Sequence, residues 1–201
     1  MTFELILTFA AYAFVTSITP GPNNTMLLAS GVNYGLLRTV PHILGVSLGF
    51  GAMVFAVGSG LGSLFVAFPA LHTVLRWVGA AYLLWLAWRI AVSGTMKDEA
   101  TNANPLTFLE AAAFQWVNPK CWVMATGAIA TYMPPTGDVS DLMVITVLFC
   151  LINGPCVGSW AGFGVVLRRW LSDLQANRFF NVAMAVLLVL SLHPLLTEGM
   201  W

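Results

Sequence analysis

The segment "SITPGPNNTM", residues 17–26, lies inside an otherwise apolar stretch near the start of the chain. It places two prolines and a glycine where a membrane-spanning helix should be most regular. A proline has no backbone N–H, so a helix that contains one loses the hydrogen bond to the carbonyl four residues earlier. The segment therefore predicts a helix that is interrupted near the middle of a bilayer.

The composition indicates that the surrounding solvent is lipid. The 201 residues are 59% hydrophobic and 8% charged, with a mean hydropathy of +0.84. Soluble domains carry roughly 25% charged residues, and so small a charged fraction cannot cover a water-exposed surface. The chain is predicted to be an all-α integral membrane protein with a single transmembrane domain over 1–201. Its zero net charge and dispersed basic residues argue against a nucleic-acid partner.

Six apolar segments can be separated by their interruptions, and a spanning helix needs about 20 residues. The polar stretch 93–106 divides the chain into two three-helix halves, about 1–92 and 107–201. The predicted spans are 3–32, 38–66, 70–92, 107–132, 139–167 and 178–197.

The basic residues near the span ends predict the orientation, because Lys and Arg accumulate on the cytoplasmic side. One side holds Arg38, Arg89, Lys97, Arg168, Arg169 and Arg178. The other side holds Arg76 with Glu4, Asp138, Asp141 and Glu198. The first side is predicted to be cytoplasmic, so that both termini are periplasmic. The N-terminal segment lacks a basic n-region and is interpreted as the first span instead of a cleaved signal peptide.

The first helix of the second half is also interrupted, at Val117-Asn118-Pro119-Lys120. Irregular backbone at membrane depth is tolerated only against protein or a water-filled cavity. Spans one and four cross in opposite directions, so the positive N-termini of their second half-helices should meet near the midplane and attract an anion. This pattern is typical of transporters built from inverted repeats. The alternative is that the prolines only set helix packing. Pro20, Pro22 and Pro119 should release the carbonyls of Thr16, Ile18 and Gln115.

The predicted substrate-binding residues come from both interruptions: Pro20, Gly21, Pro22, Asn23 and Asn24 from the first, and Gln115, Asn118, Pro119 and Lys120 from the second. A lysine near the bilayer centre normally faces a cavity or a partner. Lys120 is therefore expected to bind a substrate carboxylate and to couple proton movement, with snorkelling to the interface as the alternative. Glu110 is a second coupling candidate, or else an interfacial acid. No cofactor and no metal site is predicted.

Other features have two readings each. His42 is either a proton relay or a structural histidine, and Arg76 is either an outer-gate residue or an interfacial anchor. The second and fifth spans each contain a GxxxG motif, Gly45/Gly49 and Gly158/Gly162, which favours close helix packing within the chain or in a homodimer. Asn153-Gly154-Pro155 is predicted to break the fifth span and is a candidate hinge. The three cysteines, Cys121, Cys150 and Cys156, are expected in the core.

The motifs "TPGPNN", "GVSLGFG", "GAAYLLWLAW" and "FQWVNPKCW" together resemble the LysE/RhtB family of bacterial amino-acid exporters, along nearly the whole chain. The resemblance is greatest to the cysteine and O-acetylserine exporter type, with homoserine, threonine and leucine exporters as neighbours. It implies a multi-pass secondary exporter of the bacterial inner membrane, driven by protons. The family's motifs fall on Pro20, Gly21, Pro22 and Asn23, and on Asn118, Pro119 and Lys120.

Three alternative functions were weighed. ATP-driven transport is disfavoured because the chain has no GxxxxGK[ST] motif. An intramembrane enzyme is disfavoured because His42, His72 and His193 are scattered and show no His-x-x-x-His spacing. A metal-cation exporter of the same superfamily stays open, although cation sites prefer several carboxylates or thiols.

Overall fold

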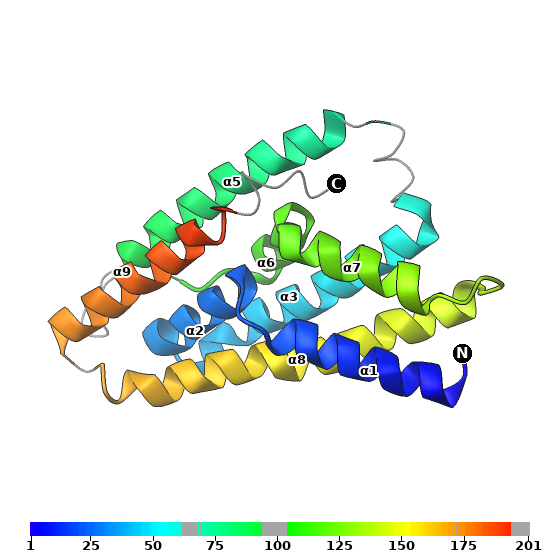
Figure 1. Cartoon of the computed structure of the whole chain (residues 1–201). Coiled ribbons are helices and arrows are strands. Elements are labelled where there is room, and N and C mark those ends of the chain that lie inside the picture. Colours follow the sequence, from blue (N-terminus) through cyan, green and yellow to red (C-terminus); the bar gives the residue numbers. More distant parts are fainter. Residues whose placement is uncertain (62–67, 69, 94–103, 172, 194–201) are drawn as a thin grey trace.

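The computed structural model describes residues 1–61, 68, 70–93, 104–171 and 173–193, and within these the ordered elements are helices (Figure 1). The helical prediction is confirmed for this part of the chain. In order, the elements are α1 (Phe3–Ile18), α2 (Pro22–Tyr34), α3 (Leu36–Ala56), η1 (Val57–Leu61), α5 (Ala70–Ala91), α6 (Phe108–Phe114), η2 (Gln115–Val117), α7 (Pro119–Tyr132), α8 (Val139–Arg168) and α9 (Leu174–Leu190).

Three helical stretches among the described residues are long and apolar enough to cross a membrane: Leu36–Leu61, Thr73–Ala91 and Val139–Arg168. The pair α1 and α2 forms a fourth span if its two parts, bent by 58°, are taken together. Helix α9 is apolar but has 17 residues, which is shorter than a typical span. The structure thus supports a helical membrane protein, while the arrangement as six spans in two inverted repeats stays a prediction.

Most of the basic residues in the described part of the chain, Arg76 and Lys120 excepted, gather at one end of the molecule. The last turns of α2, α5 and α8 and the first turns of α3 and α9 lie at that end in Figure 1. Arg89 and Arg168 stand in the last turns of α5 and α8. Asp141 stands in the first turn of α8, at the opposite end. Lys97 and Glu198 lie outside the described residues, and the side of the membrane that each end faces stays a prediction.

Helix α8 lies at the centre of the packing and contacts α1, α2 and α3. Phe149 of α8 joins two neighbouring helices through edge-to-face ring contacts. Its ring centroid lies 5.4 Å from that of Phe9 in α1 and 4.8 Å from that of Phe50 in α3. All three side chains are buried, and aromatic pairs of this geometry add to the stability of a core.

The two GxxxG motifs do not play matching roles. In α3, a Cβ at Gly49 would lie 2.5 Å from the Cα of Ala112, and a Cβ at Gly45 would collide with the carbonyl oxygen of Phe108. These glycines therefore let α6 approach α3 closely. In α8, a Cβ at Gly162 would have no atom of the described structure within 4 Å, and one at Gly158 would meet only Ile43, at 4.0 Å.

The close contact of α8 with α2 uses other positions. A Cβ on Gly31 of α2 would collide with the carbonyl oxygen of Ala161, and a Cβ on Gly164 would collide with the carbonyl oxygen of Leu28. Of the two alternatives for the second GxxxG motif, the described structure does not show close packing within the chain, because Gly164 makes the contact with α2 and Gly158 and Gly162 do not; packing in a homodimer stays a prediction.

The predicted break at Asn153-Gly154-Pro155 is also wrong. Helix α8 runs through Pro155 without interruption for 30 residues. A single proline removes one backbone hydrogen bond, and its side chain is exposed here, so neighbouring turns hold the helix together.

Candidate functional site

Both predicted interruptions are present at the expected residues. Helix α1 ends at Ile18 and α2 begins at Pro22 after an extended Gly21. In the second half, α6 tightens into η2 and Asn118 becomes extended, with a ψ of 112°. Helix α7 then begins at Pro119. A proline is well tolerated at the first position of a helix, where its missing N–H would have no partner in any case.

The carbonyl groups released by the prolines find other donors. The Ile18 carbonyl accepts a hydrogen bond from Trp160 Nε1 at 3.1 Å, and the Thr16 carbonyl accepts one from Thr19 Oγ1 at 3.1 Å. The Gln115 carbonyl accepts from the Asn118 N–H at 3.4 Å. The interrupted backbone is thus satisfied by nearby protein groups, as its position in an apolar environment requires.

Asn24 closes the end of α1. Its Nδ2 donates to the carbonyl oxygens of Ser17 at 3.0 Å and Thr19 at 2.7 Å. The Asn24 side chain is buried, so a short polar side chain from the start of α2 fixes the last turn of α1. These hydrogen bonds fix the angle between α1 and α2.

A reciprocal amide pair connects the two interruptions. Asn23 Nδ2 donates to Gln115 Oε1 at 2.7 Å, and Gln115 Nε2 donates to Asn23 Oδ1 at 3.2 Å. Cys121 Sγ also donates to Gln115 Oε1, at 3.0 Å. Gln115 is fully buried, and neutral hydrogen bonds of this kind tie the first half of the chain to the second.

Lys120 lies in the first turn of α7 and reaches across to the end of α1. Its Nζ donates to the carbonyl oxygen of Thr19 at 2.6 Å and lies 3.5 Å from that of Pro20. The C-terminus of a helix carries a partial negative charge, which favours a cation. Among the described residues, Lys120 makes no ion pair with a carboxylate. The ammonium group is therefore held by peptide dipoles alone.

The two interruptions surround one small cavity of about 20 Å³, which leaves room for about one water molecule. Two buried polar atoms of lining residues have no hydrogen-bond partner in the described structure, Asn118 Nδ2 and Asn153 Oδ1. The Gly21 N-cap also gives α2 no side-chain cap. The lining residues are Thr16, Ser17, Gly21, Asn23, Asn24, Phe50, Asn118, Lys120, Cys121, Met124, Asn153 and Val157.

The nine predicted site residues divide into two groups. Gly21, Asn23, Asn24, Asn118 and Lys120 line the cavity. The other four support it: Pro22 and Pro119 begin the two half-helices, Gln115 holds Asn23, and the exposed Pro20 lies beside the Lys120 ammonium.

Glu110 lies elsewhere. Its carboxylate accepts from the Thr107 N–H at 2.8 Å, and its own N–H donates to Thr107 Oγ1 at 3.3 Å, a capping box at the start of α6. It also faces Arg89, with an N–O distance of 3.6 Å. Glu110 is not among the residues that line the Lys120 cavity. Its local hydrogen bonds give it a structural task that the sequence analysis did not anticipate.

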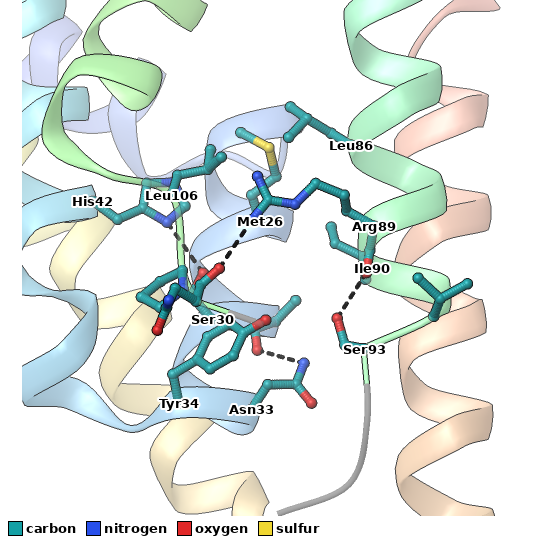
Figure 2. Close-up of a pocket in the computed structure, with 14 residues that line it drawn as sticks. Met26, Ser30, Asn33, Tyr34, His42, Leu86, Arg89, Ile90, Ser93 and Leu106 are labelled. Carbon is teal, nitrogen blue, oxygen red and sulfur yellow. Dashed lines mark hydrogen bonds between the residues drawn. The ribbon is translucent and has the colours of Figure 1, made fainter. Parts of the chain in front are cut away.

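A larger cavity of about 200 Å³ was missed entirely by the sequence analysis. It lies at the basic end of the molecule, between α2, α3, α5 and residues 104–106 (Figure 2). Beside it, Asn33 of α2 and Asn181 of α9 form a second amide pair, with N–O distances of 2.8 and 3.2 Å. Asn177 and Asn181 stand one turn apart in an apolar segment. This spacing could have indicated a buried polar contact on that face of the helix.

Apolar helices with paired interruptions at a polar internal cavity are typical of helical membrane transport proteins. The sequence model of the family described as "LysE type translocator" matches residues 14–198. The chain therefore belongs to the LysE-type translocator family, which makes it a transporter and not an enzyme.

Similar proteins of known name are bacterial. The chain is 36% identical over 191 residues to the cysteine/O-acetylserine efflux protein of Escherichia coli strain K12, a match that covers 94% of this chain and 96% of the relative. The proteins of the same description from Escherichia coli O9:H4 and Shigella sonnei match equally well, at 36% identity over the same 94% and 96%. No solved structure matches. The apolar helices and these relatives indicate a protein of the bacterial inner membrane.

Proposed function

We propose that this protein exports small neutral amino acids, of the cysteine and O-acetylserine class, from the cytoplasm to the periplasm. The bacterial relatives that carry this description support the substrate class, since they match over nearly the full length of both chains. The two three-helix halves act as inverted repeats and open alternately to the two sides of the membrane. In Figure 1, α1 and α2 run in the opposite sense to α6 and α7, which supports this arrangement.

The observation that carries the proposal is the place of Lys120. Its ammonium group is held by the carbonyl oxygens of Thr19 and Pro20, and no carboxylate of the described residues pairs with it. A substrate carboxylate would bind this cation more strongly than neutral carbonyls do, because it brings a full negative charge where each carbonyl offers only a partial one. The uncapped start of α2 and the unpartnered Asn118 Nδ2 supply further donors for the same group.

Loading requires the cavity to widen, because about 20 Å³ cannot hold an amino acid. When Lys120 leaves Thr19, the end of α1 loses a cation, and Asn23 still joins the two interruptions through Gln115 and Cys121. Separation of Asn23 from these two residues lets the halves move apart. We also propose that Lys120 binds and releases a proton during the cycle. Movement of this proton into the cytoplasm drives export of the substrate.

The proposal is tested in inside-out vesicles with radiolabelled O-acetylserine, with and without a proton gradient. The wild type should accumulate the label when the gradient is present. Lys120→Ala should abolish this uptake, and Lys120→Arg should retain binding but reduce coupling, since guanidinium does not release its proton. Arg178→Gln, an exposed basic residue of α9, serves as the matched control. Uptake that survives unchanged in both Lys120 variants would overturn the proposed role.

A further inference from the structure

The cavity of about 200 Å³ shares no lining residue with the Lys120 cavity. Helix α2 nevertheless lines both. Its first turn, with Asn23 and Asn24, borders the Lys120 cavity, whereas Ser30 and Asn33 from its later turns border the larger one. The two cavities therefore lie one after the other along α2, and the last turn of α2 is at the end where α5 and α8 also finish (Figure 1).

Arg89 of α5 extends into this cavity from one wall (Figure 2). Its Nη2 donates to the carbonyl oxygen of Asn104 at 3.1 Å, and its guanidinium lies 4.9 Å from the centroid of the Trp85 ring. Its ion pair with Glu110, at 3.6 Å, is long and partly exposed, and such pairs contribute little. A guanidinium has five N–H donors in a planar fork. Arg89 is therefore oriented and still able to bind a second carboxylate.

His42 of α3 supplies a polar group on another wall. Its side chain is fully buried, and its ring points from α3 toward Ser30, whose Oγ lies 3.1 Å from His42 Nδ1 (Figure 2). His42 Nε2 is buried and has no hydrogen-bond partner within the described structure. A buried polar atom left without a partner is costly. If Nδ1–H donates to Ser30, the Ser30 hydroxyl oxygen keeps a lone pair that can accept from a bound ammonium group, and His42 holds that hydroxyl in place.

The size and lining of the cavity fit a small amphiphilic molecule. A cavity of about 150 Å³ holds benzene, so about 200 Å³ holds a somewhat larger molecule. The rest of the lining includes four apolar side chains, Met26, Leu86, Ile90 and Leu106. The cavity thus offers a carboxylate partner, an ammonium partner and an apolar surface for a short side chain.

We propose that this cavity is a loading site for zwitterionic α-amino acids, in which Arg89 binds the carboxylate and the Ser30–His42 pair binds the amino group. The substrate binds here first and then moves along α2 to the Lys120 cavity. This inference rests on the proposed export function, but it concerns a separate set of residues.

Binding of radiolabelled O-acetylserine to the purified full-length protein in detergent tests the inference without transport. Lys120→Ala removes the cation of the Lys120 cavity, and this variant should still bind the label at the larger cavity. Adding Arg89→Gln to it should lower the affinity at least tenfold, whereas adding Arg178→Gln should leave the affinity unchanged. If Lys120→Ala alone removes all binding, or if Arg89→Gln has no effect, the loading site does not exist.

Two further measurements separate ligand binding from a structural role of Arg89. Glu110→Gln removes the ion pair but keeps a residue that suits a capping box. Glu110→Gln should bind O-acetylserine at least as tightly as the wild type. If Arg89 acts only through its ion pair, Glu110→Gln should instead lose as much affinity as Arg89→Gln. The Lys120→Ala variant should also prefer cysteine to its methyl ester, which lacks the carboxylate charge, and adding Arg89→Gln should abolish this preference. Equal discrimination in both proteins would overturn the inference.

The two proposals fail separately. In one case, the detergent-solubilised protein binds O-acetylserine through Arg89 but vesicles show no uptake under any gradient. That result would refute export and leave the loading site intact. Vesicles that transport normally with Arg89→Gln, at an unchanged KM from the cytoplasmic face, would refute the loading site and keep export.

Discussion

The two GxxxG motifs allow a matched test of the packing, because the same substitution should have opposite effects in them. At Gly49, an added methyl group would lie 2.5 Å from the Cα of Ala112 and 2.8 Å from its Cβ. The nearest of these atoms belongs to the backbone, so α6 must move away from α3. At Gly162, the same methyl group would meet nothing within 4 Å of it in the described structure.

The magnitudes follow from two opposing terms. Overpacking of a tight contact costs about 1–3 kcal/mol, whereas replacing Gly by Ala within a helix returns about 0.5–1 kcal/mol. Gly49→Ala should therefore lose about 0–2.5 kcal/mol, with a midpoint of about 1 kcal/mol. Gly162→Ala should gain up to about 1 kcal/mol, because only the second term applies.

Thermal unfolding of the purified protein in one detergent, followed by tryptophan fluorescence, measures both variants. A change of 1 kcal/mol shifts Tm by about 2–4 °C for a chain of this size. Gly49→Ala should lower Tm by several degrees, while Gly162→Ala should leave it unchanged or raise it. An equal loss in both variants would refute the reasoning, since it would mean that Gly162 is packed against something, such as a second copy of the chain.

Three further outcomes are expected. Gly21→Ala should reduce O-acetylserine uptake in vesicles without lowering the amount of folded protein, because the new methyl group would lie 2.8 Å from Lys120 Cδ and displace that side chain from α1; normal uptake would contradict the contact. Asn23→Leu should lower stability by about 1–3 kcal/mol because it removes both hydrogen bonds of the amide pair and leaves Gln115 with Cys121 and Ala111 as partners, and adding Gln115→Leu should cost less than the sum of the single changes, a shortfall that a double-mutant cycle of Tm values detects. Pro155→Ala should leave uptake and Tm unchanged or slightly improved, since α8 is continuous there; a loss of uptake would restore the hinge hypothesis.

The interruptions could be predicted from the sequence because they depend on local chemistry. Pro22 and Pro119 have no N–H wherever the chain folds, so the half-helices begin at these residues in the structure. Lys120 could be placed near the first interruption for a similar reason, since two spans that cross in opposite directions bring their midpoints together.

The misjudged features depend on which helix lies beside a given face. Gly45/Gly49 and Gly158/Gly162 look alike in the sequence, yet α6 covers only the first pair. Pro155 resembles Pro119, but α8 continues through Pro155, whereas the residue before Pro119, Asn118, is extended and its side chain caps α7.

The larger cavity could not be predicted from the sequence. Its walls come from α2, α3, α5 and residues 104–106, which are far apart along the chain. Arg89 was interpreted only through its value for membrane orientation, and Ser30 and Asn33 resemble ordinary polar residues of a helix interface. Tertiary packing alone brings these side chains together.

The contact between Lys120 and the end of α1 has a consequence for the transporter between cycles. A carrier with an open, wetted midpoint would conduct protons and small ions whenever no cargo is present. Here the protein's own ammonium group fills that position against Thr19 and Pro20. We therefore expect the protein to conduct no ions in the absence of substrate. Lys120 occupies the site until a substrate displaces it.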